Sequence, residues 1–124
     1  MRKTIIIDGK KCEFKSSAAI PRMYRLKFNR DIFVDLAKLD ADVKKSEKVK
    51  EASGESVLPI QSLEVFENVA FLMHKHGDPS QPKDIDEWLE QFEMFDIYDI
   101  LPQIMEMWQI ETEQKSVAKK GTGK

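Results

Sequence analysis

Cysteine, histidine and glycine are all scarce in this 124-residue sequence, which contains one, two and five of them, respectively. The single cysteine, Cys12, excludes an internal disulfide and any cysteine-based zinc site. With so few glycines, a loop whose backbone cradles a phosphate group is not expected. No apolar run approaches the roughly 20 residues of a membrane span, and the short run of isoleucines near the N-terminus is too brief for a secretory signal. We therefore expect an intracellular protein.

Positive charge is missing from one long stretch of the chain. Residues 84–114 hold ten Asp and Glu and no Lys or Arg, whereas residues 1–50 hold 14 Lys and Arg against seven Asp and Glu. Such an acidic segment repels nucleic acid as strongly as the basic one attracts it. The two segments can instead attract each other, within one chain or between neighbouring copies. Alternatively, the charges are merely sorted by sign along exposed helical surfaces and have no partner.

The N-terminal segment, residues 3–15, predicts an antiparallel β-hairpin. Ile5 and Ile7 alternate with polar residues, as do Cys12 and Phe14, and the Asp-Gly pair between the two arms favours a type I′ turn. This turn would place the four apolar side chains on one face. Because an isolated hairpin is only marginally stable, that face must pack on helices. Cys12 is then interpreted as a core residue rather than a nucleophile.

Apolar residues at helical spacing predict a bundle of about five helices over residues 21–112. Pro21 suits the first position of a helix, and Asn29 accepts the left-handed conformation at its end. Asp31 and Ser62 stand where they can cap the next two helices. The expected fold class is therefore mainly α with an N-terminal β-hairpin, that is, a small α+β domain.

Two features interrupt the helical pattern. Residues 46–61 are rich in Lys, Glu and Ser and lack a sustained apolar period, so they predict a helix that frays near residue 48 into a mobile loop. Pro102 lies inside the last apolar stretch and should kink that helix or split it. With 41% hydrophobic residues, the chain can build one modest core. We expect a single domain over residues 1–114 and a flexible tail over residues 115–124.

No pattern in the sequence points to catalysis. His74 and His76 are two residues apart, unlike the i, i+4 pair of a metalloprotease, and are interpreted as histidines that interact with the dipole at a helix C-terminus. The carboxylates of Asp86, Glu90 and Glu93 fall on the side away from the aromatic residues of the same segment, as a solvated face should. We therefore expect no enzyme activity, no metal site and no cofactor.

A basic helix over residues 22–30 raises nucleic-acid binding as an alternative function. Leu26 and Phe28 should face the core, which leaves the basic residues as an outer face. A helix-turn-helix needs a polar recognition helix after the turn, but residues 32–34 are apolar. A solvated basic face is therefore favoured, and a small DNA-binding regulator is kept as the second hypothesis.

The C-terminal part of the chain has more aromatic and methionine side chains than one buried stripe requires. Large neighbours such as Met94-Phe95 and Met107-Trp108 cannot both point inward from a helix. Exposed methionine and aromatic side chains suit apolar helical partners, although filling of the core around Pro102 would use the same residues. The candidates for partner binding are Trp88, Phe92, Phe95, Tyr98, Leu101, Met105 and Trp108.

A set of short motifs occurs in a fixed order along roughly residues 3–112. The motifs are Ile-Asp-Gly-Lys in the hairpin, Ala-x-Pro-Arg-x-Tyr-Arg from Ala19, Asp-Ile-Phe from Asp31, Trp88-Leu89, and Phe-Asp-Ile-Tyr-Asp-Ile-Leu-Pro from Phe95 with Trp108 after it. In this order and spacing the chain resembles the tail assembly chaperones of long-tailed bacteriophages and prophages of Gram-positive bacteria.

The resemblance implies a small, mostly helical protein that coats the tape measure protein and keeps it soluble. It also implies that the protein brings in tail tube subunits and leaves before the tail is finished. The expected location is accordingly the cytoplasm of the bacterial host, and not the mature virion.

Our hypothesis from the sequence combines the resemblance with the charge pattern. The aromatic end would bind apolar faces of tape-measure helices, while basic residues of one copy contact acidic residues of the next. Head-to-tail contacts of this kind do not close and would give a filament or spiral. The candidates for self-association are Arg22, Arg25, Arg30, Asp86, Glu90 and Glu93.

Overall fold

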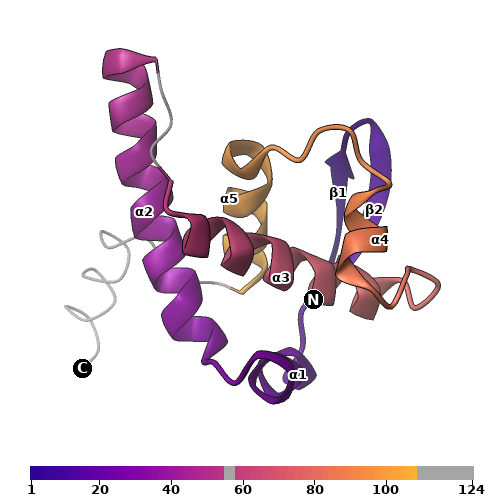
Figure 1. The fold of residues 1–124 in the computed structure, drawn as a ribbon. Helices are drawn as coiled ribbons and strands as arrows, with labels where there is room; N and C mark the ends of the chain where they lie inside the picture. Colours follow the sequence, from indigo (N-terminus) through magenta and orange to yellow (C-terminus); the bar gives the residue numbers. More distant parts are fainter. Residues whose placement is uncertain (55–57, 109–124) are drawn as a thin grey trace, which may run out of the picture.

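The structure is a computed structural model that describes residues 1–54 and 58–108 (Figure 1). It consists of an N-terminal antiparallel hairpin followed by helices, which confirms the predicted fold class. The predicted tail over residues 115–124 and the centre of the predicted loop, residues 55–57, lie outside the described residues. The elements are β1 (Arg2–Ile7), β2 (Lys10–Lys15), α1 (Ala19–Phe28), α2 (Ile32–Ser53), α3 (Ile60–Gly77), α4 (Ile85–Leu89) and α5 (Ile97–Met107).

The hairpin has the predicted turn and register. Asp8 and Gly9 both have positive φ, at 54° and 79°, as a type I′ turn requires. Ile5 pairs with Cys12, and all four apolar side chains of the expected inner face are buried. Cys12 is therefore a core residue, as predicted.

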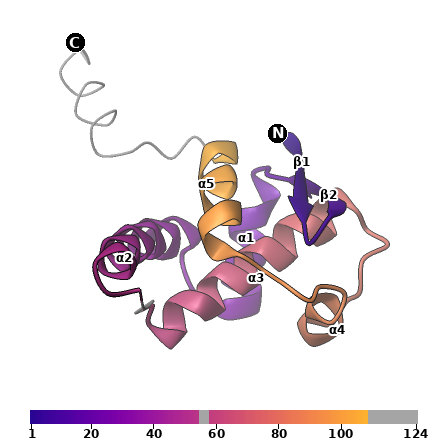
Figure 2. The same ribbon diagram turned by 90° about the horizontal axis from the view of Figure 1, so that it is seen from above.

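Helix α3 occupies the centre of the fold. It contacts β2 and each of the other four helices. In Figure 2, α2 is seen along its axis while α3 runs across it, and α4 lies on the far side of α3 from α2. The hairpin packs tightly against the end of α3, because a Cβ atom added at Gly77 would lie only 2.4 Å from the backbone oxygen of Glu13.

The N-terminal boundaries of α1 and α3 differ from the prediction. Helix α1 begins at Ala19, so Pro21 is its third residue, still within the first turn, where a missing N–H removes no helical hydrogen bond. Helix α3 begins at Ile60, and Pro59 rather than Ser62 precedes it. The Ser62 hydroxyl instead donates to Asp42 Oδ2 at 2.6 Å, which ties α3 to α2.

Helix α2 continues to Ser53 and does not fray near residue 48. Its buried positions extend only to Ser46, so the last two turns are mostly exposed and rest on helix-favouring residues more than on packing. Gly54 then ends the helix in the left-handed conformation, with φ at 82°. Asp31 caps the other end as predicted, since its carboxylate accepts from the backbone N–H groups of Phe33 and Val34.

Helix α5 runs continuously from Ile97 to Met107 with Pro102 inside it, so the helix is not split there. Pro102 is exposed and removes only the hydrogen bond that would have reached the carbonyl of Tyr98. Among the described residues, no helix combines the length and the apolar character needed to cross a membrane.

Candidate interaction surfaces

Trp88 of α4 is the centre of an aromatic cluster inside the molecule. Its side chain is fully buried and makes edge contacts with the rings of Phe71, Phe92 and Phe95. Its indole N–H donates to Nδ1 of His74 at 2.8 Å, which joins α4 to α3. Trp88 therefore holds the short α4 helix in place.

His74, in the last turn of α3, is a buried core residue with a neutral imidazole. The ring is stacked on Phe14 of the hairpin, with 5.3 Å between centroids, and Nδ1 must be unprotonated to accept from Trp88. Burial lowers the pKa of His74, although the nearby Asp78 and Glu13 oppose the change.

His76 is half-buried, and its Nε2 atom lies 3.1 Å from the Ser17 hydroxyl. Its pKa is lowered too, by burial and by the charges of Lys15 and Arg2. Over residues 1–54 and 58–108, no group of three or more His, Cys, Asp or Glu side chains is placed to hold a metal ion.

The seven candidates for partner binding do not form one surface. Trp88, Leu101 and Met105 are buried and pack within their own chain. The other four are half-buried, and only Phe92 and Phe95 stack on each other, beside Trp88. Each of the four rings also has a further neighbour within the chain. They are Phe92 beneath Lys10, Phe95 against Phe66, Tyr98 with its hydroxyl 2.7 Å from that of Ser46, and Trp108 beside Phe33.

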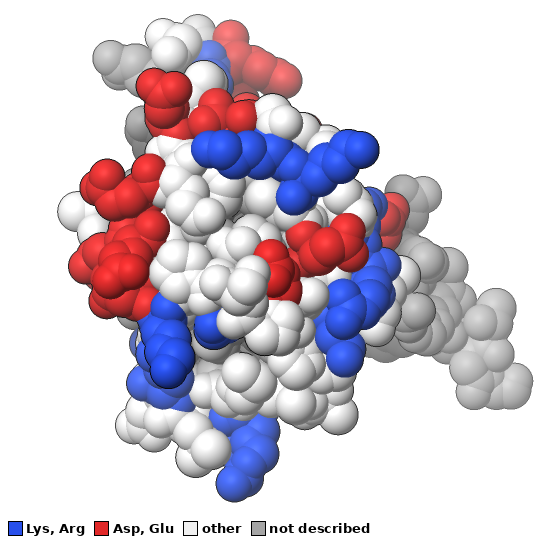
Figure 3. Space-filling view, turned by 90° about the vertical axis from the view of Figure 1, so that its right-hand side faces the viewer, with Lys and Arg blue, Asp and Glu red and all other residues white. Residues whose placement is uncertain are grey.

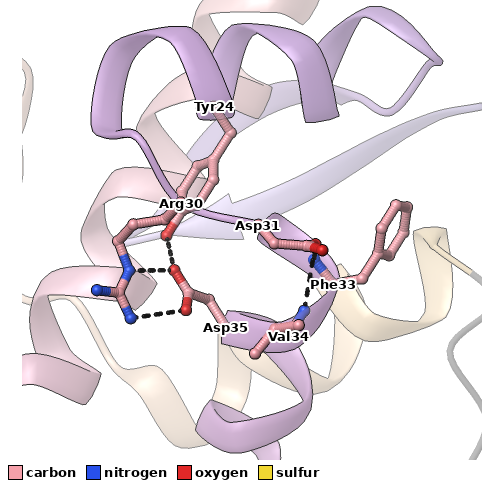
Figure 4. Close-up of polar contacts among 6 residues, drawn as sticks. All are labelled: Tyr24, Arg30, Asp31, Phe33, Val34 and Asp35. Carbon is pink, nitrogen blue, oxygen red and sulfur yellow. Dashed lines mark hydrogen bonds and ion pairs between the residues drawn. The ribbon is translucent and has the colours of Figure 1, made fainter.

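Arg30, a candidate for self-association, is bound within its own chain (Figure 4). Its Nε and Nη2 atoms donate to the carboxylate of Asp35 at 2.6 and 2.8 Å, and the Tyr24 hydroxyl donates to the same carboxylate at 2.6 Å. Burial alone would raise the pKa of Asp35, but the hydrogen bonds from Arg30 and Tyr24 outweigh it and lower the pKa. Through Tyr24 and Asp35, this cluster links α1 to α2.

The remaining self-association candidates are exposed. Arg22 and Arg25 lie on α1, while Asp86 lies on α4 and Glu90 and Glu93 follow close behind. In Figure 3, acidic side chains gather along the left-hand flank of the molecule, directly above a group of Lys and Arg side chains. Complementary charges therefore lie next to each other on this face.

Leu26 is 67% exposed, so the prediction that it faces the core is wrong. The buried residues of α1 are Ile20 and Tyr24, four positions apart on one face, and a residue two positions after Tyr24 points to the opposite side. This i, i+4 pair was the signal in the sequence that could have placed Leu26 at the surface.

Leu26 borders an apolar groove of about 500 Å³ between α1 and α3. Phe71 and Leu72 are buried beneath the groove, and none of its lining residues is acidic. We call it the lysine groove; its lining residues are Met23, Leu26, Lys27, Phe71, Leu72, Lys75 and Lys83. The Lys75 ammonium donates to the carbonyls of Pro79 and Gln81, which holds the following loop at the edge of the groove.

A second apolar surface lies on the other side of α1. Phe33 and Val34 are 48% and 63% exposed, and the Phe33 ring meets Trp108 edge-on at 5.7 Å between centroids. Phe33 also lines a groove of about 380 Å³ with Pro21 and Ile32. We call Pro21, Phe33, Val34 and Trp108 the Phe33 surface. Phe33 directly follows the buried Ile32 and therefore points to another side of α2.

The sequence and structure were compared with known proteins in three searches. Searches of protein-family models, of curated proteins and of solved structures each found no match.

Proposed function

We propose that the chain is a tail assembly chaperone of the phage type that it resembles, acting in the cytoplasm of the host and not carried into the mature virion. In this role it binds and coats the tape measure protein, keeps it soluble and helps to recruit tail tube subunits, without catalysis. The Phe33 surface is the observation that carries the proposal. Large apolar side chains are exposed there beside a groove, which suits the apolar face of a partner helix.

This assignment moves the centre of partner binding away from most of the aromatic residues predicted from the sequence. Trp108 belongs to both sets, whereas Trp88, Leu101 and Met105 are needed for the core. Exposed Phe33 and Val34 follow each other at the start of α2, where the Asp31 cap fixes the backbone. A rigid helix end of this kind presents the two side chains without a cost in ordering them.

The test is co-expression of the chain with the tape measure protein encoded in the same genome. We expect the wild-type chain to keep the partner soluble and to co-purify with it in several copies. The double variant Phe33→Ala/Val34→Ala should reduce the recovered partner by at least about tenfold, because aromatic anchors dominate such interfaces. Ile60→Ala, at an apolar residue of α3 that is 77% exposed, is the matched control and should bind normally.

A partner that stays insoluble beside a soluble wild-type chain would contradict the proposal. Equal recovery with the wild type and the double variant would instead reject the Phe33 surface as its binding site. Circular dichroism on the purified variants checks that both retain the helical fold.

The proposal includes self-association through opposite charges, with basic residues of α1 against acidic residues around α4. Arg22 and Arg25 remain candidates for this contact, whereas Arg30 is held by Asp35. Contact between copies would allow the chain to cover a long partner.

A small DNA-binding regulator is the alternative function. It is favoured by exposed Arg22, Arg25 and Lys27 on one helix that contains no acidic residue. Gel retardation at low salt tests it, since contacts with phosphate are strongest there. A shift that is lost in Arg22→Ala/Arg25→Ala would support the alternative, and no shift would reject it.

A further inference from the structure

The floor of the lysine groove is apolar. Phe71 and Leu72 of α3 are buried beneath it, and Leu26 of α1 stands at its edge with 67% exposure. Within the described part of the chain, nothing covers Leu26 or the groove of about 500 Å³ beside it. Apolar side chains of a second molecule would be stabilised here, because they and Leu26 would leave water together.

The charged residues that line this groove are all positive. Lys27 is on α1, Lys75 is near the end of α3, and Lys83 is in the segment before α4. Among the described residues, none of these three lysines pairs with a carboxylate. The Lys75 ammonium is held by two neutral carbonyl groups, which fix its position without cancelling its charge. Positive charge is therefore present on the α1 side and on the α3 side of the groove.

A groove between two helices suits a third helix. A partner helix inserts apolar side chains at i, i+3, i+4 and i+7 into such a groove, and its two flanks lie over the rim. Carboxylates on these flanks would meet Lys27 on one side and Lys75 and Lys83 on the other. An apolar stripe bordered by Asp and Glu therefore matches both the floor and the rim.

Extended anionic surfaces fit the groove less well than a single helix. The residue after Lys83 is Asp84, the N-cap of α4, and the exposed Asp86 and Glu87 follow in that helix. A bilayer or a nucleic-acid duplex that covered the groove would also approach these carboxylates and be repelled by them. A helix that occupies only the groove avoids this repulsion.

Helix α1 separates the lysine groove from the Phe33 surface. The residues of α1 that line the lysine groove are Met23, Leu26 and Lys27, whereas Pro21 and Arg25 line the groove beside Phe33. At about 3.6 residues per turn, these two sets point to opposite sides of α1. A partner in one groove therefore leaves the other accessible.

We propose that the lysine groove is a binding site for an acidic amphipathic helix of a partner protein, separate from the Phe33 surface. The inference goes beyond the proposed function, in which the Phe33 surface binds the tape measure protein. With both sites occupied, one chain holds two helices at once, one on each side of α1.

A synthetic peptide of about 15 residues is the probe, because shorter helices are marginal in water. It carries leucine at i, i+3, i+4 and i+7, glutamate beside the leucines and alanine elsewhere. Methyl NMR spectra at low salt should show shifts at Met23, Leu26 and Leu72 and none at Val34 or Ile60. A peptide with lysine in place of glutamate should bind at least about tenfold more weakly, because its charges repel the rim.

Variants of the groove test both of its properties, with fluorescence anisotropy of the labelled peptides as the measurement. Lys27→Glu/Lys83→Glu should reverse the preference, so that the lysine peptide binds more tightly than the glutamate peptide. Leu26→Glu should weaken binding of the glutamate peptide at least about tenfold, because it places a negative charge at the apolar edge. Lys11→Glu/Lys48→Glu is the matched control. It makes the same charge change at exposed residues of β2 and α2 and should bind like the wild type.

Three results would overturn the proposal. They are the absence of groove shifts with the glutamate peptide, equal binding of that peptide by the wild type and the groove variants, and groove shifts caused only by anionic vesicles or duplex DNA. The last result would assign the groove to an extended anionic surface. Circular dichroism checks the fold of each variant, and Leu26→Glu keeps the test decisive if the double variant does not fold.

The double variant Phe33→Ala/Val34→Ala distinguishes this proposal from the proposed function. It should bind the glutamate peptide like the wild type while it recovers less tape measure protein. Loss of peptide binding in this variant would overturn the separation of the two sites. Failure of the co-expression test alone would leave peptide binding in the lysine groove unchanged.

Discussion

Trp88 and His74 form the polar contact at the point where the hairpin, α3 and α4 meet. The contact requires a neutral imidazole, because Nδ1 accepts the indole N–H. Phe14 covers the other side of the ring. The cluster that positions α4 therefore depends on Nδ1 of His74 remaining unprotonated.

The free energy of unfolding should fall as the pH drops below the ordinary pKa of histidine. Because the pKa of His74 is lowered in the folded state, the unfolded chain takes up the proton first, and acid favours unfolding. Urea unfolding followed by tryptophan fluorescence at about pH 7.5 and about pH 5.5 brackets the ordinary value.

His74→Gln should reduce this pH dependence, since a glutamine oxygen can accept from Trp88 but does not titrate in this range. His76→Gln is the matched comparison, because His76 is less buried and shifts in the same direction. An unchanged difference between the two pH values in His74→Gln would show that His74 is not the group responsible.

At the scale of elements, the hairpin depends on close approach to α3. The backbone of Glu13 and Phe14 lies against Gly77, and Arg2 Nη1 donates to the Gly77 carbonyl at 3.1 Å. Such an approach leaves no space for a side chain at the end of α3.

Gly77→Ala should therefore destabilise the protein by about 1–3 kcal/mol, as overpacking against a rigid backbone does. Chemical denaturation measures the loss. Gly54→Ala is an informative comparison, since open space surrounds Gly54 and only its positive φ disfavours a side chain. If Gly77→Ala left the midpoint unchanged, the close packing of hairpin and helix would be wrong.

Elements set by local chemistry were predictable from the sequence, and those set by distant contacts were not. The turn at Asp8 and Gly9 and the caps at Asp31 and Asp84 follow from the residues themselves. Ser62 looked like a cap, but its hydroxyl is used by Asp42 twenty residues away. No local rule shows which of two plausible partners a hydroxyl takes.

At the scale of the whole molecule, basic and acidic side chains lie next to each other on one face (Figure 3). The boundary between Lys83 and Asp84 is also the boundary between the lysine groove and α4. The sequence predicted that opposite charges were sorted along the chain. It did not show that Arg30 is bound by Asp35, or that Phe33 is exposed, because both features depend on how α1 packs against α2.

Self-association should weaken as the salt concentration rises. Exposed charges are screened beyond roughly 10 Å at 0.1 M ionic strength and over shorter distances at higher salt. Sedimentation of the wild-type chain from low to high salt measures the effect. Association that strengthens with salt would indicate an apolar contact instead, and the Phe33 surface would be the place to look for it.

The hairpin also has consequences for synthesis on the ribosome. Ser16 at its end donates to the carbonyl of Met107, 91 residues later, and Lys3 pairs with Glu106. At roughly 5–20 residues per second, the ribosome needs several seconds to supply those partners, whereas a hairpin forms in about 1–10 μs. The hairpin can therefore form long before α3 and α5, the two helices that contact it, have been made. A chain stalled before α5 would therefore lack the contacts of this helix with β1, α2 and α3.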